Sequence, residues 1–102
     1  MLDTSRWSGG NTALDALACA LPPVALPGRF MRGRQSTAML RQIGVPELVA
    51  RDDDDYIAIA ARLAAEPGWR AELRDRIRGG REGLFDDAVP TTALAEALIA
   101  LA

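Results

Sequence analysis

A glycine-rich turn near the N-terminus has residue types that bind an anion. The turn reads Gly9-Gly10-Asn11-Thr12, and the apolar run that follows it predicts a helix. The first N–H groups of a helix have no partner inside it, and the helix dipole adds partial positive charge there. Glycine also lets the backbone come close to a phosphate. The turn is therefore a candidate phosphate site.

The same residues fit a second interpretation that needs no ligand. Thr12 would be the N-cap of the helix and Asp15 the N3 residue of a capping box. This interpretation starts the helix at Thr12. The run of apolar residues continues to Leu21, and Pro22–Pro23 then stops the helix.

A group of arginines is the second candidate for chemistry. Arg29, Arg32 and Arg34 surround Gly33, after the short apolar run Val24–Leu26 and before a predicted helix that ends at a C-cap glycine, Gly44. Ligands of open α/β folds bind where strands end. The alternative is a solvated loop in which the arginine stems pack on the surface.

The sequence lacks the residue that most often serves as a general base or a metal ligand. It contains no histidine, the commonest general base and metal ligand. The acidic run Asp52–Asp55 is typical of a helix start, because acidic residues complement the helix dipole there. Consecutive helix residues point in different directions and do not converge on one ion. We therefore assign no catalytic residue, no metal site and no cofactor.

Length and composition indicate one modest domain. The chain has 102 residues and a net charge of −2, which favours neither nucleic acid nor an anionic membrane as partner. No apolar run reaches the ~20 residues that span a membrane, and no signal-peptide pattern occurs, so a cytoplasmic location is expected. Cys19, the single cysteine, is expected to be buried in the first helix.

The alternation of short apolar runs with helical patterns predicts an α/β fold. We expect short parallel strands at Val24–Leu26 and Leu48–Ala50, and a helical C-terminal third. Further helices are expected at 56–65, at 69 to about 83 and from Thr91 or Thr92 to the end, after a linker at 86–90. We expect a main unit at 1–88 and a C-terminal helix at 89–102.

Several stretches give the chain a resemblance to a known enzyme family. They are Trp7–Cys19, Leu26–Ser36, Gly44–Ala50 and Asp55–Ala60. In that order they resemble bacterial O-linked N-acetylglucosamine transferases of the SPINDLY type, in glycosyltransferase family 41. The resemblance covers nearly the whole chain and implies the last part of the second, Rossmann-like lobe of a GT-B fold. Tetratricopeptide repeats often precede that catalytic region, and no such repeat occurs here.

The resemblance implies how the glycine turn would bind the UDP part of a nucleotide-sugar donor. The expected donor-binding residues are Gly9, Gly10, Asn11, Thr12, Asp15 and Arg34. Gly10 to Thr12 match positions that contact the diphosphate, Asp15 matches a residue that accepts hydrogen bonds from the ribose, and Arg34 matches an arginine of the motif. Some relatives have histidine in place of Gly10, so backbone donation would have to do more here.

The resemblance implies a donor-binding fragment of an enzyme that moves N-acetylglucosamine from UDP-GlcNAc to Ser and Thr hydroxyls of proteins. Alone it is expected to be inactive, since acceptor binding would lie upstream. One alternative is a non-catalytic interaction module derived from such a lobe, and another is a related transferase with a different nucleotide sugar. We also expect a homo-oligomer, because a strand edge and the stripe Leu94, Leu98 and Leu101 would lack a cover.

Overall fold

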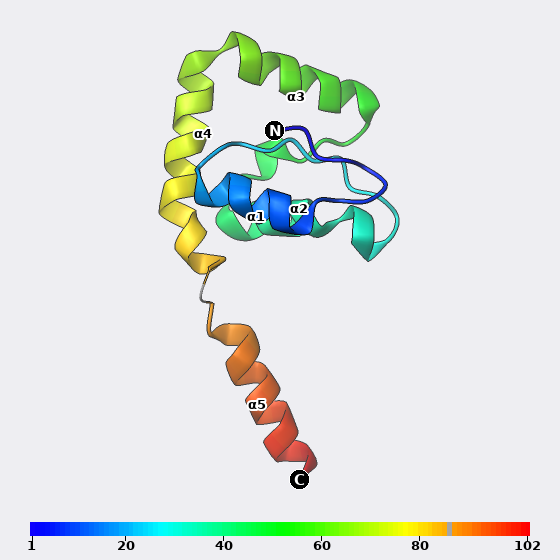
Figure 1. Ribbon diagram of the computed structural model, residues 1–102, viewed down its shortest axis with the longest axis vertical. Coiled ribbons are helices and arrows are strands. Elements are labelled where there is room, and N and C mark those ends of the chain that lie inside the picture. The colour runs from blue at the N-terminus through cyan, green and yellow to red at the C-terminus, as the bar shows by residue number, and fades with distance from the viewer. Residues whose placement is uncertain (86) are drawn as a thin grey trace.

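The computed structural model describes residues 1–85 and 87–102 (Figure 1). Residue 86, the first of the expected linker, lies outside the described residues. Among the described residues, five α-helices follow one another: α1 (Gly10–Ala18), α2 (Gln35–Ile43), α3 (Asp53–Ala65), α4 (Pro67–Gly80) and α5 (Val89–Leu101). Three short 3-10 helices complete the elements: η1 (Met31–Gly33), η2 (Pro46–Leu48) and η3 (Arg81–Gly83).

The predicted α/β fold, a partial Rossmann-like lobe with parallel strands, is wrong. The extended segments are joined by single parallel bridges only, Leu2 with Val24 and Ala25 with Val49, and no bridge in the described residues extends into a strand. Prolines explain this result. Pro22–Pro23 and Pro27 enclose the middle segment, and proline cannot donate a ladder hydrogen bond. The expected strand at 48–50 also loses Leu48 to η2.

The core lies between α3 on one side and α1 with α2 on the other, and the extended segments pass through it (Figure 1). α4 runs along one side and contacts α1, α2 and α3. The buried members of this core are Leu17, Ala20, Val24, Ala25, Leu40, Ile43, Val45, Leu48, Leu63, Leu73 and Ile77. Every helix from α1 to α4 contributes to it, so this single core fixes the positions of their ends.

The first three helices begin at the same end of the molecule. In Figure 1, α1, α2 and α3 all start on the right and run to the left. α1 and α2 are in contact, and Tyr56 in the first turn of α3 donates its hydroxyl to Asp3 C=O at 2.8 Å, just before α1. The positive ends of three helix dipoles therefore lie near one another.

The end of α1 differs from the prediction. The helix stops at Ala18, four residues before Pro22, because Ala20 adopts the left-handed conformation with φ of 56°. Leu21 N–H then reaches Ala16 C=O at 2.8 Å, as in a Schellman motif. Cys19 is exposed at this cap, so the expectation that it is buried is wrong.

The predicted C-cap of α2 is confirmed. Gly44 has φ of 95°, and its N–H bonds back to the last turn of the helix. α3 begins as expected within the acidic run, and Asp52 is its N-cap, which accepts from Asp55 N–H at 2.7 Å. α4 ends at Gly80 and η3 continues to Gly83.

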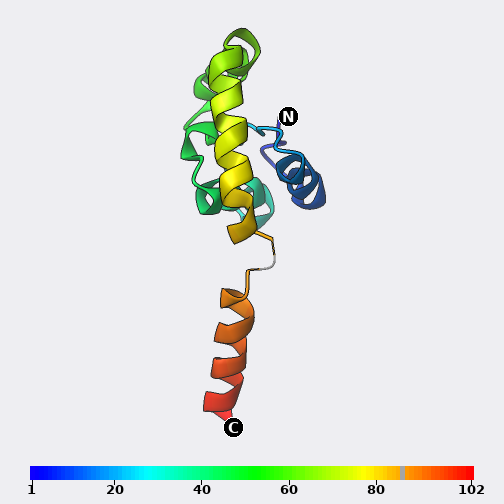
Figure 2. The ribbon, with the colours of Figure 1, turned by 90° about the vertical axis from the view of Figure 1, so that its left-hand side faces the viewer.

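α5 stands apart from the rest of the molecule. It extends beyond the end of α4 in both views, and none of its residues is buried (Figures 1 and 2). It begins at Val89, inside the expected linker, rather than at Thr91 or Thr92. The Cα extents of 55 × 29 × 19 Å reflect this projection. Within the described residues, no helix is long and apolar enough to cross a membrane.

Candidate functional site

The glycine turn forms the N-terminus of α1. Gly9 is the N-cap and Gly10 the first helical residue. The first intrahelical bond runs from Ala13 N–H to Gly9 C=O at 3.1 Å. The N–H groups of Gly10, Asn11 and Thr12 therefore precede the hydrogen-bond ladder and are left to donate outward. Three consecutive free backbone donors at a helix start form a suitable binding site for an anion.

The capping-box interpretation is wrong. Thr12 lies inside the helix at N3, not at the N-cap, and no side chain of the described residues caps α1. The side chains of Asn11, Thr12 and Asp15 are instead all exposed. Because Asp15 lies four residues after Asn11 and three after Thr12, the three side chains share one helix face. The structure thus brings the expected contacts of α1 together on one surface.

The buried carboxylate of Asp3 forms hydrogen bonds with the glycine turn. Asp3 is only 7% exposed, and its Oδ1 accepts Gly9 N–H at 2.9 Å. Its Oδ2 accepts the Ser8 hydroxyl at 2.8 Å. Burial and then the negative charge of Asp3 raise the pKa of Tyr56, which keeps this phenol protonated as a donor. No sequence motif indicates this cluster, because Asp3 has no fixed spacing to the turn and Tyr56 lies 53 residues away.

The start of α2 lies against the same turn. Ser36 N–H donates to Ser8 Oγ at 3.0 Å, and Ser8 N–H donates to Arg32 C=O at 2.6 Å. A Cβ placed on Gly10 would lie 2.7 Å from Gln35 Oε1, so the Gln35 carboxamide occupies the space in front of Gly10. Gln35 is a polar site residue that the sequence did not indicate, although its place two residues after Gly33 marks the helix start.

Arg34 is exposed at the N-cap of α2, directly before Gln35. The backbone thus places it at the same end of the molecule as the glycine turn. Arg29 and Arg32 are exposed in the loop before it. The Arg32 guanidinium lies 5.5 Å from the ring centre of Trp7 and 5.1 Å from that of Phe30, within cation–π range. These exposed aromatic rings form a second surface beside the turn.

The acidic run performs a structural task. Asp52 caps α3, and Asp55 accepts from Arg51 N–H at 2.9 Å, a bond that lowers the pKa of Asp55. In residues 1–85 and 87–102, no three Cys, Asp or Glu side chains cluster as metal ligands would.

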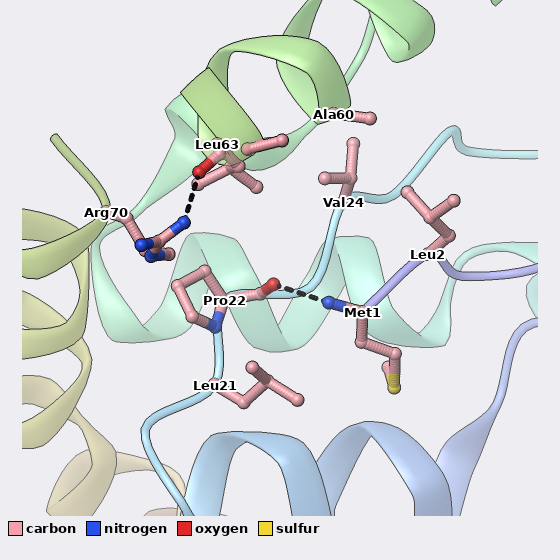
Figure 3. Close-up of a pocket in the computed structure, with 9 residues that line it drawn as sticks. Met1, Leu2, Leu21, Pro22, Val24, Ala60, Leu63 and Arg70 are labelled. Carbon is pink, nitrogen blue, oxygen red and sulfur yellow. Dashed lines mark hydrogen bonds between the residues drawn. The ribbon is translucent and has the colours of Figure 1, made fainter. Parts of the chain in front are cut away.

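An apolar hollow lies away from the turn. Its volume is about 300 Å³. Figure 3 shows Leu2, Leu21, Val24, Ala60 and Leu63 around it. The Arg70 guanidinium at its rim donates to Leu63 C=O at 2.8 Å. Most of this lining is apolar, and its two cations, the Arg70 guanidinium and the Met1 ammonium, already donate to backbone carbonyls. The hollow therefore suits an apolar group better than a diphosphate.

The model of the family described as glycosyl transferase family 41 matches residues 1–91, which include the glycine turn, the arginine loop and both helix starts. The chain belongs to this family. The match ends three residues into α5, so most of that helix lies beyond the family model.

Curated relatives of this family 41 chain carry the same enzyme name. It is 36% identical over 87 residues to a UDP-N-acetylglucosamine--peptide N-acetylglucosaminyltransferase of Caenorhabditis elegans. It is 31% identical over 78 residues to a probable SPINDLY enzyme of that name from rice, Oryza sativa subsp. japonica. These matches cover 83% and 76% of the chain but only 8% of each relative.

A solved structure shows the same arrangement. A mutant of the Thermobaculum terrenum O-GlcNAc transferase superposes with a TM-score of 0.82 at 38% sequence identity. The match covers 96% of this family 41 chain and 19% of that chain.

Proposed function

We propose that this chain is a donor-binding part of an enzyme that transfers N-acetylglucosamine from UDP-GlcNAc to protein hydroxyls. The observation that carries the proposal is the start of α1, where Gly10, Asn11 and Thr12 present three outward N–H groups. The names of the family 41 relatives support the choice of UDP-GlcNAc and of protein acceptors.

In this proposal the diphosphate binds at the start of α1 and the ribose binds Asp15. Backbone N–H groups and the Thr12 hydroxyl are donors that phosphate oxygens accept, and a carboxylate accepts from a diol. Arg34 at the start of α2 adds positive charge close to the same end. Gly9 offers the ligand no free donor, because it has no side chain and its N–H is already bonded to Asp3; in this proposal it serves the site as the N-cap of α1.

We test donor binding by NMR titration of the 102-residue chain with UDP. The amides of Gly10 to Asp15 should shift, with a Kd of about 1 mM, or roughly −4 kcal/mol. Asp15→Ala should raise the Kd, and Asp75→Ala, which removes an exposed carboxylate on α4, should not. GDP should bind more weakly than UDP if the site recognises the uracil base. Shifts confined to another surface would show that the glycine turn is not the site.

A non-catalytic interaction module is the competing proposal. It predicts that neither UDP nor GDP shifts the amide resonances, although the chain has the same fold. We also expect that this chain alone transfers no sugar, since catalysis requires donor, acceptor and base held together and the chain contains no histidine. Glycosylation of a peptide by the purified chain would contradict this expectation.

We further propose that the chain self-associates and that 89–102 is a unit separate from 1–88. All of α5 is exposed, including Leu94, Leu98 and Leu101, and it carries one charged residue, Glu96. Burying three leucines contributes about 2 kcal/mol each toward a partner. A cytoplasmic location stays a prediction from the sequence.

A further inference from the structure

We propose that Asp3 is the positioning residue of the glycine turn: its buried carboxylate fixes the backbone donors at the start of α1 and couples them to α2. This inference rests on the proposed donor site. Asp3 itself is placed behind the turn, and nothing in the family comparison assigns it a role.

The carboxylate acts through two bonds. Oδ1 accepts Gly9 N–H at 2.9 Å and Oδ2 accepts the Ser8 hydroxyl at 2.8 Å. Both oxygens are acceptors, which an ionised carboxylate provides and an amide does not. Bonds to a charged acceptor are stronger than neutral ones, so they restrain the turn at two successive residues.

The restraint determines which donors remain for a ligand. Gly9 has no side chain with which to cap α1. Without Asp3, its N–H would be a further free donor that could bind the anion. With that N–H bonded to Asp3, the groups left are those of Gly10, Asn11 and Thr12. A donor set fixed before binding loses less conformational entropy when the ligand arrives.

The same carboxylate reaches the start of α2 through Ser8. Ser8 is 2% exposed, its Oγ accepts Ser36 N–H at 3.0 Å, and it lies 2.9 Å from Ser36 Oγ. Because one hydroxyl carries one proton, the proton of Ser8 goes to Asp3 and its lone pairs serve Ser36. Asp3 thereby determines how α2, with Arg34 and Gln35 at its start, sits against α1.

A link to α3 completes the arrangement. Tyr56 donates its hydroxyl to Asp3 C=O at 2.8 Å. One residue thus contacts the first turns of three helices, directly or through Ser8. Helix geometry alone would not keep three helix starts together, whereas the Ser36–Ser8 and Tyr56–Asp3 bonds join residues 28 and 53 positions apart in the sequence.

Asp3→Asn tests the inference, since the amide retains the size of the side chain but offers only one acceptor and adds a donor. We expect the Kd for UDP to rise about tenfold. Hydrogen exchange of the Gly9 and Ser36 amides should accelerate. The matched control is Ile77→Val in α4, a fully buried position whose loss of a methylene destabilises the core without touching the turn.

Three results of the UDP titration are distinguishable. A weaker Kd in Asp3→Asn with an unchanged Kd in Ile77→Val supports the positioning role, because general destabilisation does not produce it. Binding by the wild-type chain with an equal Kd in Asp3→Asn overturns the inference and leaves the proposed function standing. If the wild-type amides do not respond to UDP, the proposed function fails and the positioning role fails with it.

Discussion

Two neighbouring hydroxyls at the start of α2 differ in their hydrogen bonding. Ser36 is 1% exposed and its Oγ lies 2.9 Å from Ser8 Oγ. Thr37 is 2% exposed, yet its Oγ1 has no partner among the described residues. A buried hydroxyl without a partner costs free energy, whereas a bonded one contributes to stability.

We therefore expect opposite effects at these two residues. Ser36→Ala should lower the free energy of unfolding by about 1 kcal/mol, since it removes the buried hydrogen bond between the two hydroxyls. Thr37→Val replaces the hydroxyl by a methyl of similar size and should leave stability equal or raise it by about 1 kcal/mol. Urea denaturation of both variants measures the difference. A loss of stability in Thr37→Val would mean that the hydroxyl is satisfied after all.

Two adjacent glycines in α4 make a matched pair. A Cβ on Gly79 would meet open space, but a Cβ on Gly80 would lie 2.3 Å from Ile43 C=O. Gly80 thus permits the close approach of α4 to the end of α2. Gly79→Ala should stabilise the chain by about 0.5–1 kcal/mol through helix propensity. Gly80→Ala should destabilise it by about 1–3 kcal/mol, because backbone must move.

Thermal unfolding of the two alanine variants decides this prediction. Equal melting temperatures would show that α4 does not press on α2 at Gly80. Gly68→Ala is a further control, because a Cβ there also meets open space in the first turn of the same helix.

Between elements, one ion pair ties α4 to η2. The Arg76 guanidinium pairs with the Glu47 carboxylate and also donates to Gly44 C=O at 2.6 Å. The hydrogen bond from Arg76 lowers the pKa of Glu47 below its ordinary value of 4.5. Both side chains are 39% exposed, so solvent screens the pair and we expect only about 0.2–1 kcal/mol from it.

The pH dependence of this pair has a definite sign. A carboxyl whose pKa is lower in the folded state stabilises the fold above its unfolded pKa, and the effect is lost as pH falls through the folded pKa. The stability difference between wild type and Glu47→Gln should therefore be present at about pH 6 and disappear toward about pH 3. Asp55 also has a lowered pKa, so the comparison between the two proteins is needed to isolate Glu47. A difference that persists at low pH would exclude the ion pair as its cause.

The sequence predicted local features of the fold better than pairings between segments. The helices α2 to α4 follow from apolar spacing, Gly44 and the acidic run, all of which act within a few residues. The parallel strands fail because Pro22–Pro23, Pro27 and Pro46 restrict pairing to single bridges. The glycine turn was recognisable because it is contiguous, although Thr12 is not its N-cap. Asp3 was not recognisable, since its partners lie 5, 6 and 53 residues away.

For the whole molecule, α5 gives the clearest expectation. A helix of 13 residues is marginal in water without packing, so its exposed leucines should associate with a second copy. Leu98→Arg places a charge in the apolar stripe and should yield a monomer. Ala100→Arg makes the same change in charge on the opposite face and should retain the oligomer. Light scattering across a dilution series reads the mass, and a wild-type monomer at high concentration would refute self-association.

Cys19 provides a single thiol for site-specific labelling. The thiol is exposed, and it is the single cysteine of the chain. It lies at the end of α1 opposite the glycine turn, about 14 Å away along a nine-residue helix. A paramagnetic label attached there would broaden the resonances of a ligand at the turn according to its distance, without any change to the turn itself. Air oxidation can also join two chains through a disulfide between their Cys19 thiols. Dimers that form only without a reductant would therefore be disulfide-linked and would not be evidence of association through α5.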